Sequence, residues 1–237
     1  MALAIFIAFA TLPIGSSTAD SGISPPGGRA KLKTGDYLLV TFHEQLKKSQ
    51  SLFVAVHIPR GDDELNPRNV RVKHSGADLE LSLSDAWHDG FSVTIRDDGT
   101  VKAEEQDWEE QTVFRVLDDS HFVFGAKDTP RQTYEFIGND EHYIAGLLLI
   151  GTYADDRGKI YVFGGDGRAI FPNDTFKYSL YLDTVLIGSD QFWDETHNKY
   201  YAFKRRGDTL QIVQAPEKDL AEPDWEHLLL SLHRVDP

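Results

Sequence analysis

Short runs of alternating apolar and polar residues, joined by tight turns, constrain the fold of this chain more than any other feature. Gly90–Lys102 reads GFSVTIRDDGTVK, and Asp156–Tyr178 reads DRGKIYVFGGDGRAIFPNDTFKY. In each stretch, two alternating runs flank a turn that ends in Asp-Gly. Alternation with a period of two is typical of a half-buried strand, and Asp-Gly favours the turn of a β-hairpin. The sequence therefore predicts a mainly β protein built from antiparallel strands.

Further β-rich runs follow one another from about Gly35 onward. Leu52–Ile58 is predicted to be a strand, and His142–Ile150 is apolar enough for a strand buried on both faces. Helical signal is sparse, and Phe42–Ser49 predicts one or two helical turns. Glu222–Arg234 fits either a capped helix or a terminal strand, and we favour the strand because everything before it is β.

Several markers in the first half of the chain recur in the second. The glycines of the two Asp-Gly turns, Gly99 and Gly167, lie 68 residues apart (167 − 99). Two Tyr-x-Phe motifs, which begin at Tyr134 and Tyr201, lie 67 apart (201 − 134). Each half also begins with a Gly-x-Tyr motif, in Gly35–Tyr37 and Gly151–Tyr153. A near-constant offset is what a duplication leaves, although any β-meander reuses such turns.

The expected architecture is an antiparallel up-and-down β-barrel. We predict two related units from an imperfect internal duplication, a first over residues 35–145 and a second over 146–237, which close either two barrels or one larger one. A chain of 237 residues is long enough for either arrangement to bury a core.

Residues 1–19 have the pattern of a cleavable export signal. An apolar run from Leu3 to Leu12 precedes the small-x-small site Ser17-Thr18-Ala19, and cleavage is expected after Ala19. The run is too short to span a bilayer, so no stable membrane anchor is expected. A buried N-terminal helix is the alternative. Residues 20–34 are rich in Pro, Gly and Ser and predict a flexible leader, so the expected localisation is periplasmic or secreted.

Charge and cysteine content narrow the classes of function. The chain has 38 acidic and 24 basic residues, a formal net charge of −14. Such a surface repels phosphate backbones, which argues against a nucleic-acid partner and favours small molecules or basic proteins. The chain contains no cysteine, which excludes disulfides, thiolate metal sites and a cysteine nucleophile. The protein must therefore be stabilised by its apolar core.

Gly151–Gln214 resembles the small antiparallel barrels of lipocalin-like (calycin) domains. Gly151–Tyr153 stands where lipocalins carry Gly-x-Trp, and Tyr201–Val213 (YAFKRRGDTLQIV) is similar to the closing strands of bacterial lipocalin-like proteins. Tyrosine replaces the tryptophan, and no disulfide is available. The resemblance implies an up-and-down barrel with a cavity, a fold that hosts many functions.

Catalytic and metal-binding motifs are absent from the sequence. The nine histidines form no His-x-His pair, and His43-Glu44 lacks the second histidine of a zinc-protease motif. No Gly-x-Ser-x-Gly elbow or phosphate-binding loop occurs, and the Asp-rich turns do not match the spacing of a calcium loop. We therefore expect no metal and no cofactor.

Three hypotheses for function follow. The first is an exported, non-enzymatic lipocalin-like protein that binds a small apolar or amphipathic molecule between inward-facing aromatic side chains. The second is an acidic cell-envelope protein that binds a basic partner, as an inhibitor of a cationic hydrolase does. The third is an envelope enzyme that uses dispersed histidines and carboxylates. The candidate ligand-binding residues are Trp87, Trp108, Phe114, Tyr134, Tyr178, Trp193 and Tyr201.

Overall fold

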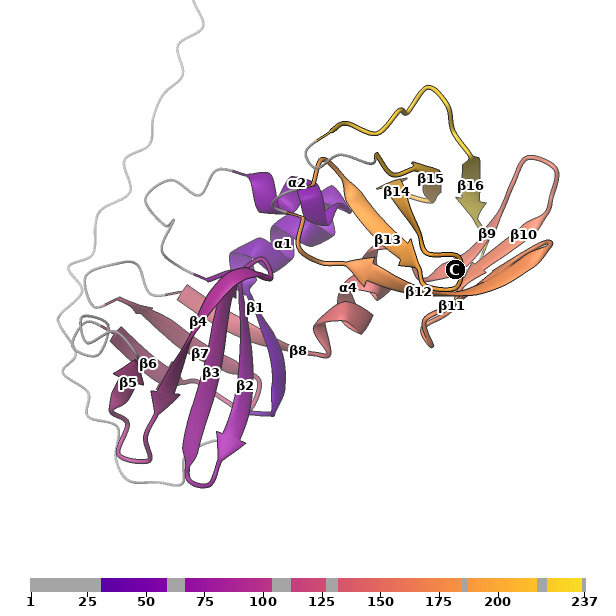
Figure 1. Ribbon diagram of the computed structural model, residues 1–237. Helices are drawn as coiled ribbons and strands as arrows, with labels where there is room; N and C mark the ends of the chain where they lie inside the picture. Colours follow the sequence, from indigo (N-terminus) through magenta and orange to yellow (C-terminus); the bar gives the residue numbers. More distant parts are fainter. Residues whose placement is uncertain are drawn as a thin grey trace, which may run out of the picture.

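The computed structural model describes residues 31–58, 67–103, 112–126, 132–184, 187–216 and 221–235. The predicted export signal and residues 20–30 of the predicted leader lie outside these ranges. Figure 1 shows two β units side by side, with helices between them. None of the described helices is long and apolar enough to cross a membrane.

The first unit is an eight-stranded antiparallel sheet with the strand order β5-β4-β3-β2-β1-β8-β7-β6. Each strand pairs with the next along the chain from β1 to β5 and from β6 to β8, and β8 returns to pair with β1. The strands are β1 (Gly35–Leu39), β2 (Asn69–Ser75), β3 (Asp78–Asp85), β4 (His88–Ile95), β5 (Val101–Ala103), β6 (Thr112–Val116), β7 (His121–Ala126) and β8 (Gln132–Gly138).

The second unit is a closed eight-stranded barrel in which β16 pairs with β9. Its strands are β9 (Gly151–Ala154), β10 (Ile160–Phe163), β11 (Arg168–Phe171), β12 (Asp174–Tyr181), β13 (Asp190–Asp194), β14 (Lys199–Arg206), β15 (Thr209–Gln214) and β16 (Leu230–Arg234). The prediction of a mainly β, up-and-down architecture with two related units is thus confirmed. The strand favoured for Glu222–Arg234 forms over the last five residues of that range.

Within the described part of the chain, three helices lie between the units: α1 (Val40–Ser49), α2 (Leu52–His57) and α4 (Asp140–Leu148). The helix expected at Phe42–Ser49 is confirmed as α1, but the strands expected at Leu52–Ile58 and His142–Ile150 are wrong. The physical reason is capping. The Ser51 side chain accepts the N–H of Val54 at 3.1 Å, and the Asn139 side chain accepts the N–H of His142 at 2.9 Å. Both caps start a helix where the apolar run alone cannot distinguish helix from strand.

The two Gly-x-Tyr motifs occupy equivalent positions at the start of the two units. The fully buried Tyr37 donates its hydroxyl to the carbonyl of Lys33 at 2.9 Å, and the fully buried Tyr153 donates to that of Leu149 at 2.9 Å. In each unit the partner lies four residues before the tyrosine. The equivalent offset is therefore 116 residues (151 − 35).

The markers at offsets of 67 and 68 residues are not equivalent. Gly99 lies between β4 and β5, whereas Gly167 lies between β10 and β11; Tyr134 is in β8 and Tyr201 in β14. Each pair is thus separated by six strands, and the two units repeat after eight. The shared turns and aromatic pairs reflect the common chemistry of β-meanders.

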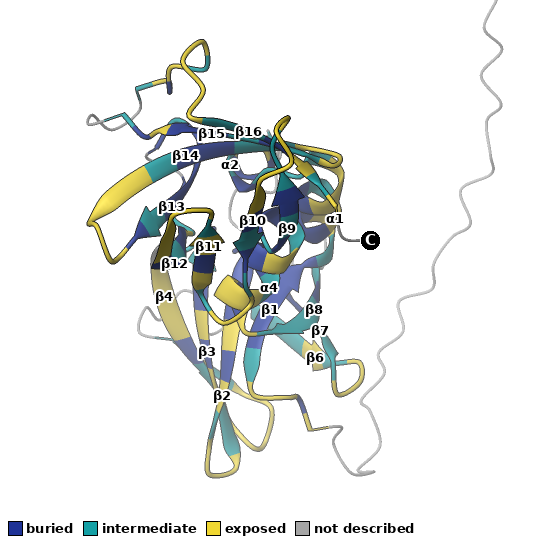
Figure 2. Ribbon diagram, turned by 90° about the vertical axis from the view of Figure 1, so that its right-hand side faces the viewer, coloured by how far each residue is buried: buried dark blue, intermediate teal, exposed yellow. Residues whose placement is uncertain are grey.

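Burial follows this architecture. Exposed residues concentrate at the tips of the hairpins, as the tip between β2 and β3 shows in Figure 2, while buried residues line the interiors and the helix layer. The helices α1, α2 and α4 bury apolar side chains between the units, among them Phe42, Leu46, Leu52 and Leu148. The apolar core therefore extends continuously from one unit to the other.

Candidate functional site

The predicted ligand-binding residues do not meet in one site. Phe114 and Tyr134 face the interior of the first unit, and Tyr178 and Tyr201 face that of the second. Trp87 lies in the β3–β4 turn and contacts α4, and Trp193 is on the outer surface of the second unit. Trp108 lies outside the described residues.

Aromatic rings fill the interior of the second unit. Phe163 lies at its centre, with ring centroids 5.4–6.3 Å from those of Tyr153, Phe171, Tyr178 and Phe192. Tyr178 also donates its hydroxyl to the carbonyl of Gly164 at 2.9 Å, and burial raises the pKa of this phenol well above its usual value. Tyr178 and its neighbours are thus packed, hydrogen-bonded core residues.

The centre of the first unit is equally well packed. Tyr134 is fully buried and stacks on Phe122, with centroids 5.0 Å apart and rings 8° from parallel. Its hydroxyl donates to the carbonyl of Pro67 at 2.8 Å. Tyr134 therefore belongs to the core and has no free polar group to offer a ligand.

One side of the first unit differs from the rest of the molecule. The sheet ends at β5 on one side and at β6 on the other, and no backbone pairing among the described residues joins these two strands. The residues along both strands that face inward are only partly covered. We call this region the open side and define it by inward-facing apolar residues of β4, β5 and β6, namely Phe91, Val101, Ala103, Phe114 and Val116.

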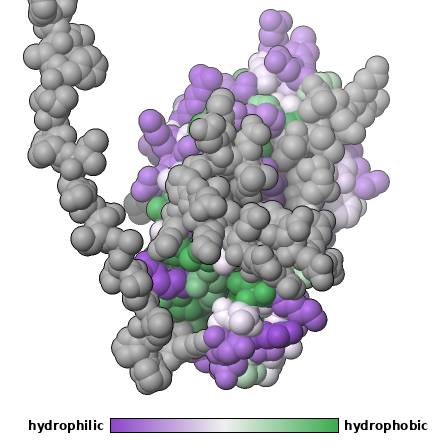
Figure 3. Space-filling model, turned by 90° about the vertical axis from the view of Figure 1, so that its left-hand side faces the viewer, coloured by the Kyte–Doolittle hydropathy of each residue, from purple (hydrophilic) through white to green (hydrophobic). Residues whose placement is uncertain are grey.

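Phe91 shows this partial covering of the open side most clearly. It pairs across β3 and β4 with Leu83, and both side chains point to the inside of the unit. Leu83 is 1 % exposed, but Phe91 is 37 % exposed because β5 is three residues long and does not reach it. Figure 3, which faces the side of the molecule where β5 and β6 lie, shows apolar surface with hydrophilic side chains beside part of it. An inward-facing aromatic ring is thus partly exposed.

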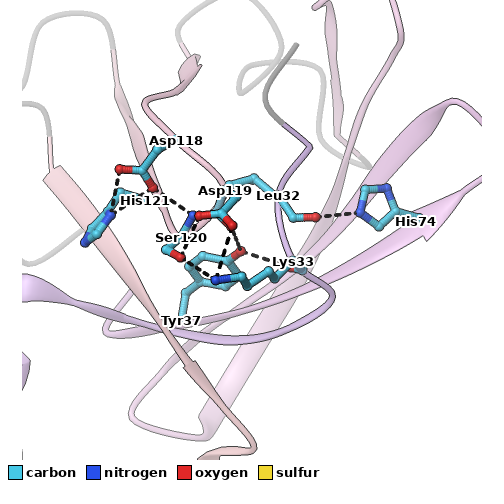
Figure 4. A network of polar contacts seen from close by, with 8 residues as sticks. All are labelled: Leu32, Lys33, Tyr37, His74, Asp118, Asp119, Ser120 and His121. Carbon is cyan, nitrogen blue, oxygen red and sulfur yellow. Dashed lines mark hydrogen bonds and ion pairs between the residues drawn. The ribbon is translucent and has the colours of Figure 1, made fainter. Parts of the chain in front are cut away.

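The segment that precedes β1 packs against the end of the first unit at which β1 begins and β2 ends. Leu32 is 2 % exposed, and its carbonyl oxygen lies 2.8 Å from Nε2 of His74. Lys33 donates its ammonium group to the Ser120 hydroxyl at 2.8 Å and lies 3.3 Å from a carboxylate oxygen of Asp119, as Figure 4 shows. Residues 31–34 of the predicted leader are therefore held against the unit. Leu32 thus packs onto the core at this end.

The charges of the neighbouring carboxylates stabilise the contacts of Lys33. Hydrogen bonds from the Ser120 hydroxyl and from Lys33 lower the pKa of Asp119, and the N–H of Ser120 together with the His121 ring lowers that of Asp118. Both carboxylates therefore stay charged around neutral pH. Burial raises the pKa of Tyr37 to about 12, which keeps its phenol protonated as a donor to the carbonyl of Lys33.

Trp87 has a structural role in the layer between the units. It forms the β3–β4 turn with Ala86, and both have positive φ angles, 66° and 55°, that non-glycine residues seldom adopt. The Trp87 indole donates to Asp140 at 2.6 Å, and its backbone N–H donates to Asn69 at 3.1 Å. Asp-Gly at positions 89 and 90 would by itself favour a turn there, but the turn lies at Ala86-Trp87, where the indole anchors α4.

A chain of partly buried polar contacts, which no motif in the sequence indicated, joins α1, β8 and α4. His43 is 3 % exposed; its Nδ1 contacts the carboxylate of Glu135, and its Nε2 lies 2.5 Å from the Tyr143 hydroxyl. Burial and, secondarily, the charge of Glu135 raise the pKa of Tyr143, so the phenol stays protonated at neutral pH. The order carboxylate, imidazole and hydroxyl resembles a catalytic triad. A catalytic hydroxyl is activated by loss of its proton, however, whereas the raised pKa of Tyr143 keeps its hydroxyl protonated. No spacing signal could have revealed residues so distant in sequence.

Trp193 lies on the outer face of the second unit. Its ring stacks on Tyr200, with centroids 6.1 Å apart and planes 13° from parallel, and Tyr181 approaches Tyr200 edge-on at 6.4 Å. Trp193 therefore does not line an interior. Of the candidates within the described ranges, Phe114 is the one that lies at the open side.

The chain matches no protein-family model, no curated protein and no solved structure. The β-barrel architecture is consistent with a calycin-like fold.

Proposed function

We propose that this chain is an exported lipocalin-like protein whose first unit binds a small apolar or amphipathic molecule at the open side. The observation that carries the proposal is the 37 % exposure of Phe91, an aromatic side chain that faces the inside of a barrel-like sheet. Phe114 and Val116 on β6 flank the same opening. The meander order of both units and the export pattern of residues 1–19 support the lipocalin-like and exported parts of the proposal.

The chemistry of the open side favours an apolar ligand. Its inward-facing side chains carry no charge, and covering apolar surface contributes roughly 25 cal/mol per Å². An amphipathic molecule would place its apolar part against Phe91 and Phe114 and leave its polar end in water. The filled centres of both units exclude deep burial, so contact at the edge of the sheet is expected.

The test is titration with N-phenyl-1-naphthylamine, an uncharged dye that fluoresces in apolar surroundings. The native protein is expected to enhance the fluorescence, and dodecanoate is expected to displace the dye. Phe91→Ser should weaken dye binding by about fivefold or more, since it removes apolar contact area. The matched control is Leu229→Ser, because Leu229 is 54 % exposed but lies in the second unit. Absence of enhancement, or equal effects of both substitutions, would refute the proposal.

A basic protein is the second candidate partner. The net charge of −14 and the exposed carboxylates of Asp118 and Asp119, whose pKa values are lowered, favour association with a cationic surface. Electrostatic association of this kind weakens steeply as salt is added. Capture of egg-white lysozyme by the immobilised protein at low but not at high ionic strength would support it, and salt-independent capture or no capture would contradict it.

A further inference from the structure

The outer face of β9, β10 and β11 carries exposed aliphatic side chains in register. Thr152 on β9 pairs with Val162 on β10, which pairs with Ile170 on β11. Their neighbours Tyr153, Phe163 and Ala169 are buried, so this row points outward. Val235 continues the row, because its N–H donates to the carbonyl of Thr152 at 2.9 Å.

The exposure of these side chains is high for a sheet face. Ile160, Ile170 and Val235 are 48 %, 51 % and 54 % exposed, and Val162 is partly exposed. We call Ile160, Val162, Ile170 and Val235 the aliphatic face. The hairpin of β9 and β10 lies on the side of the second unit away from the first (Figure 1), so the first unit does not cover it. Contiguous exposed apolar side chains mark interaction sites more often than isolated ones do.

The charges around the aliphatic face determine what can cover it. Residues 151–178 carry four Asp and four Lys or Arg residues, a net charge of zero, whereas the whole chain has a net charge of −14. Two copies of so acidic a protein repel each other over most of their surfaces. At the aliphatic face this repulsion is absent, and each copy offers both signs of charge. The eight residues are Asp155, Asp156, Arg157, Lys159, Asp166, Arg168, Asp174 and Lys177.

We propose that the aliphatic face pairs with the same face of a second copy of this chain in a two-fold symmetric dimer. A two-fold interface uses one patch twice, so an apolar strip with acidic and basic residues around it is complementary to itself. The aliphatic face spans only three strands, so its area is small compared with the roughly 800 Å² that each partner buries in a standard interface. The dimer is therefore weak, with a dissociation constant in the micromolar range. The open side belongs to the other unit, so the dimer does not depend on ligand binding.

Sedimentation velocity of the chain from residue 20 onward tests the dimer, over loading concentrations from about 1 to about 200 µM. The native protein should shift from monomer to dimer across this range, and Ile170→Lys should raise the dissociation constant by about tenfold or more. Leu117→Lys is the matched control, because Leu117 is 45 % exposed but lies in the first unit. A native protein that stays monomeric throughout, or equal effects of the two substitutions, would overturn the proposal.

Cross-linking provides an independent test, since the chain has no cysteine of its own. Mild oxidation of Ile170→Cys, with molecular oxygen and a copper–phenanthroline catalyst, joins two thiols into a disulfide as oxygen is reduced. Covalent dimers should form faster with Ile170→Cys than with Leu117→Cys, and excess native protein should slow their formation. Equal rates for the two variants would exclude a specific pairing of this face.

Discussion

Replacing Asp190 with asparagine would test how the second unit holds α2. Asp190 begins β13, is 4 % exposed, and accepts the backbone N–H of Phe53 at 2.6 Å. Hydrogen bonds from the Ser51 side chain and the Leu52 N–H also favour the charged carboxylate, but burial outweighs them and raises its pKa from 3.8 to about 6. The folded protein therefore holds this proton more tightly than the unfolded chain does.

The sign of the effect on stability follows from this difference. Below about pH 4 the carboxyl is protonated in both states, and above about pH 6 it is ionised in both. Between these values the unfolded chain has lost the proton and the folded protein retains it, so the free energy of unfolding falls as pH rises. The shift from 3.8 to about 6 corresponds to a total change of about 3 kcal/mol, at 1.36 kcal/mol per unit.

Asparagine keeps a side-chain oxygen for the N–H of Phe53 but does not titrate. Asp190→Asn should therefore lose the fall of about 3 kcal/mol between pH 4 and 6.5 and be at least as stable as the native protein at pH 7. Urea unfolding at a series of pH values, followed by tryptophan fluorescence, measures this difference. Asp156→Asn is the control, because the side chain of Asp156 is 86 % exposed, and it should keep the native pH dependence. An Asp190→Asn protein with the native slope would refute the reasoning.

Two further predictions concern positions whose geometry is equally well defined. Tyr143→Phe removes the hydroxyl that faces Nε2 of the buried His43 and should lower stability by about 1–2 kcal/mol without changing dye binding. The control is Tyr200→Phe, because Tyr200 is 42 % exposed, and it should change neither stability nor dye binding. Equal urea midpoints for the two variants would contradict this prediction. Gly35→Ala should destabilise by more than about 2 kcal/mol, because φ is +138° and a Cβ would lie 2.8 Å from a carbonyl oxygen. Gly146→Ala in α4, whose Cβ would meet nothing within 4 Å, should be neutral or stabilising by up to about 1 kcal/mol, so thermal melting should separate the two alanine variants.

The strands were predictable because alternation reports the two faces of a half-buried sheet. The stretch GFSVTI, for example, places Val93 and Ile95 inside, and both are buried. The same reasoning gave the wrong element for Leu52–Ile58, because a short run that is apolar on every side fits a helix as well as a strand. The serine before it was the available signal, since Ser51 caps α2. Capping residues deserve as much weight as periodicity when an apolar run is short.

The candidate site was less predictable than the fold. Phe114 was chosen for its aromatic ring on a strand, a property that it shares with core residues such as Tyr134. What distinguishes a ligand contact from a core residue is whether a neighbouring strand covers it, and that depends on strand length and pairing. Phe91 was missed for this reason, because its exposure follows from the short β5 and not from its own sequence context.

The two units differ in the pairing of their fifth and sixth strands. In the second unit the fifth and sixth strands, β13 and β14, pair over five residues, and Phe192 stacks on Tyr201 across them with centroids 5.2 Å apart. In the first unit the fifth and sixth strands are β5 and β6, between which the described residues show no pairing. A ligand entering the second unit here would have to separate two strands and two stacked rings. In the first unit, Phe91 and Phe114 face inward beside the gap between these strands, and both are partly exposed. Under the proposed function, the apolar ligand therefore binds at the first unit, and the closed second unit contributes the aliphatic face.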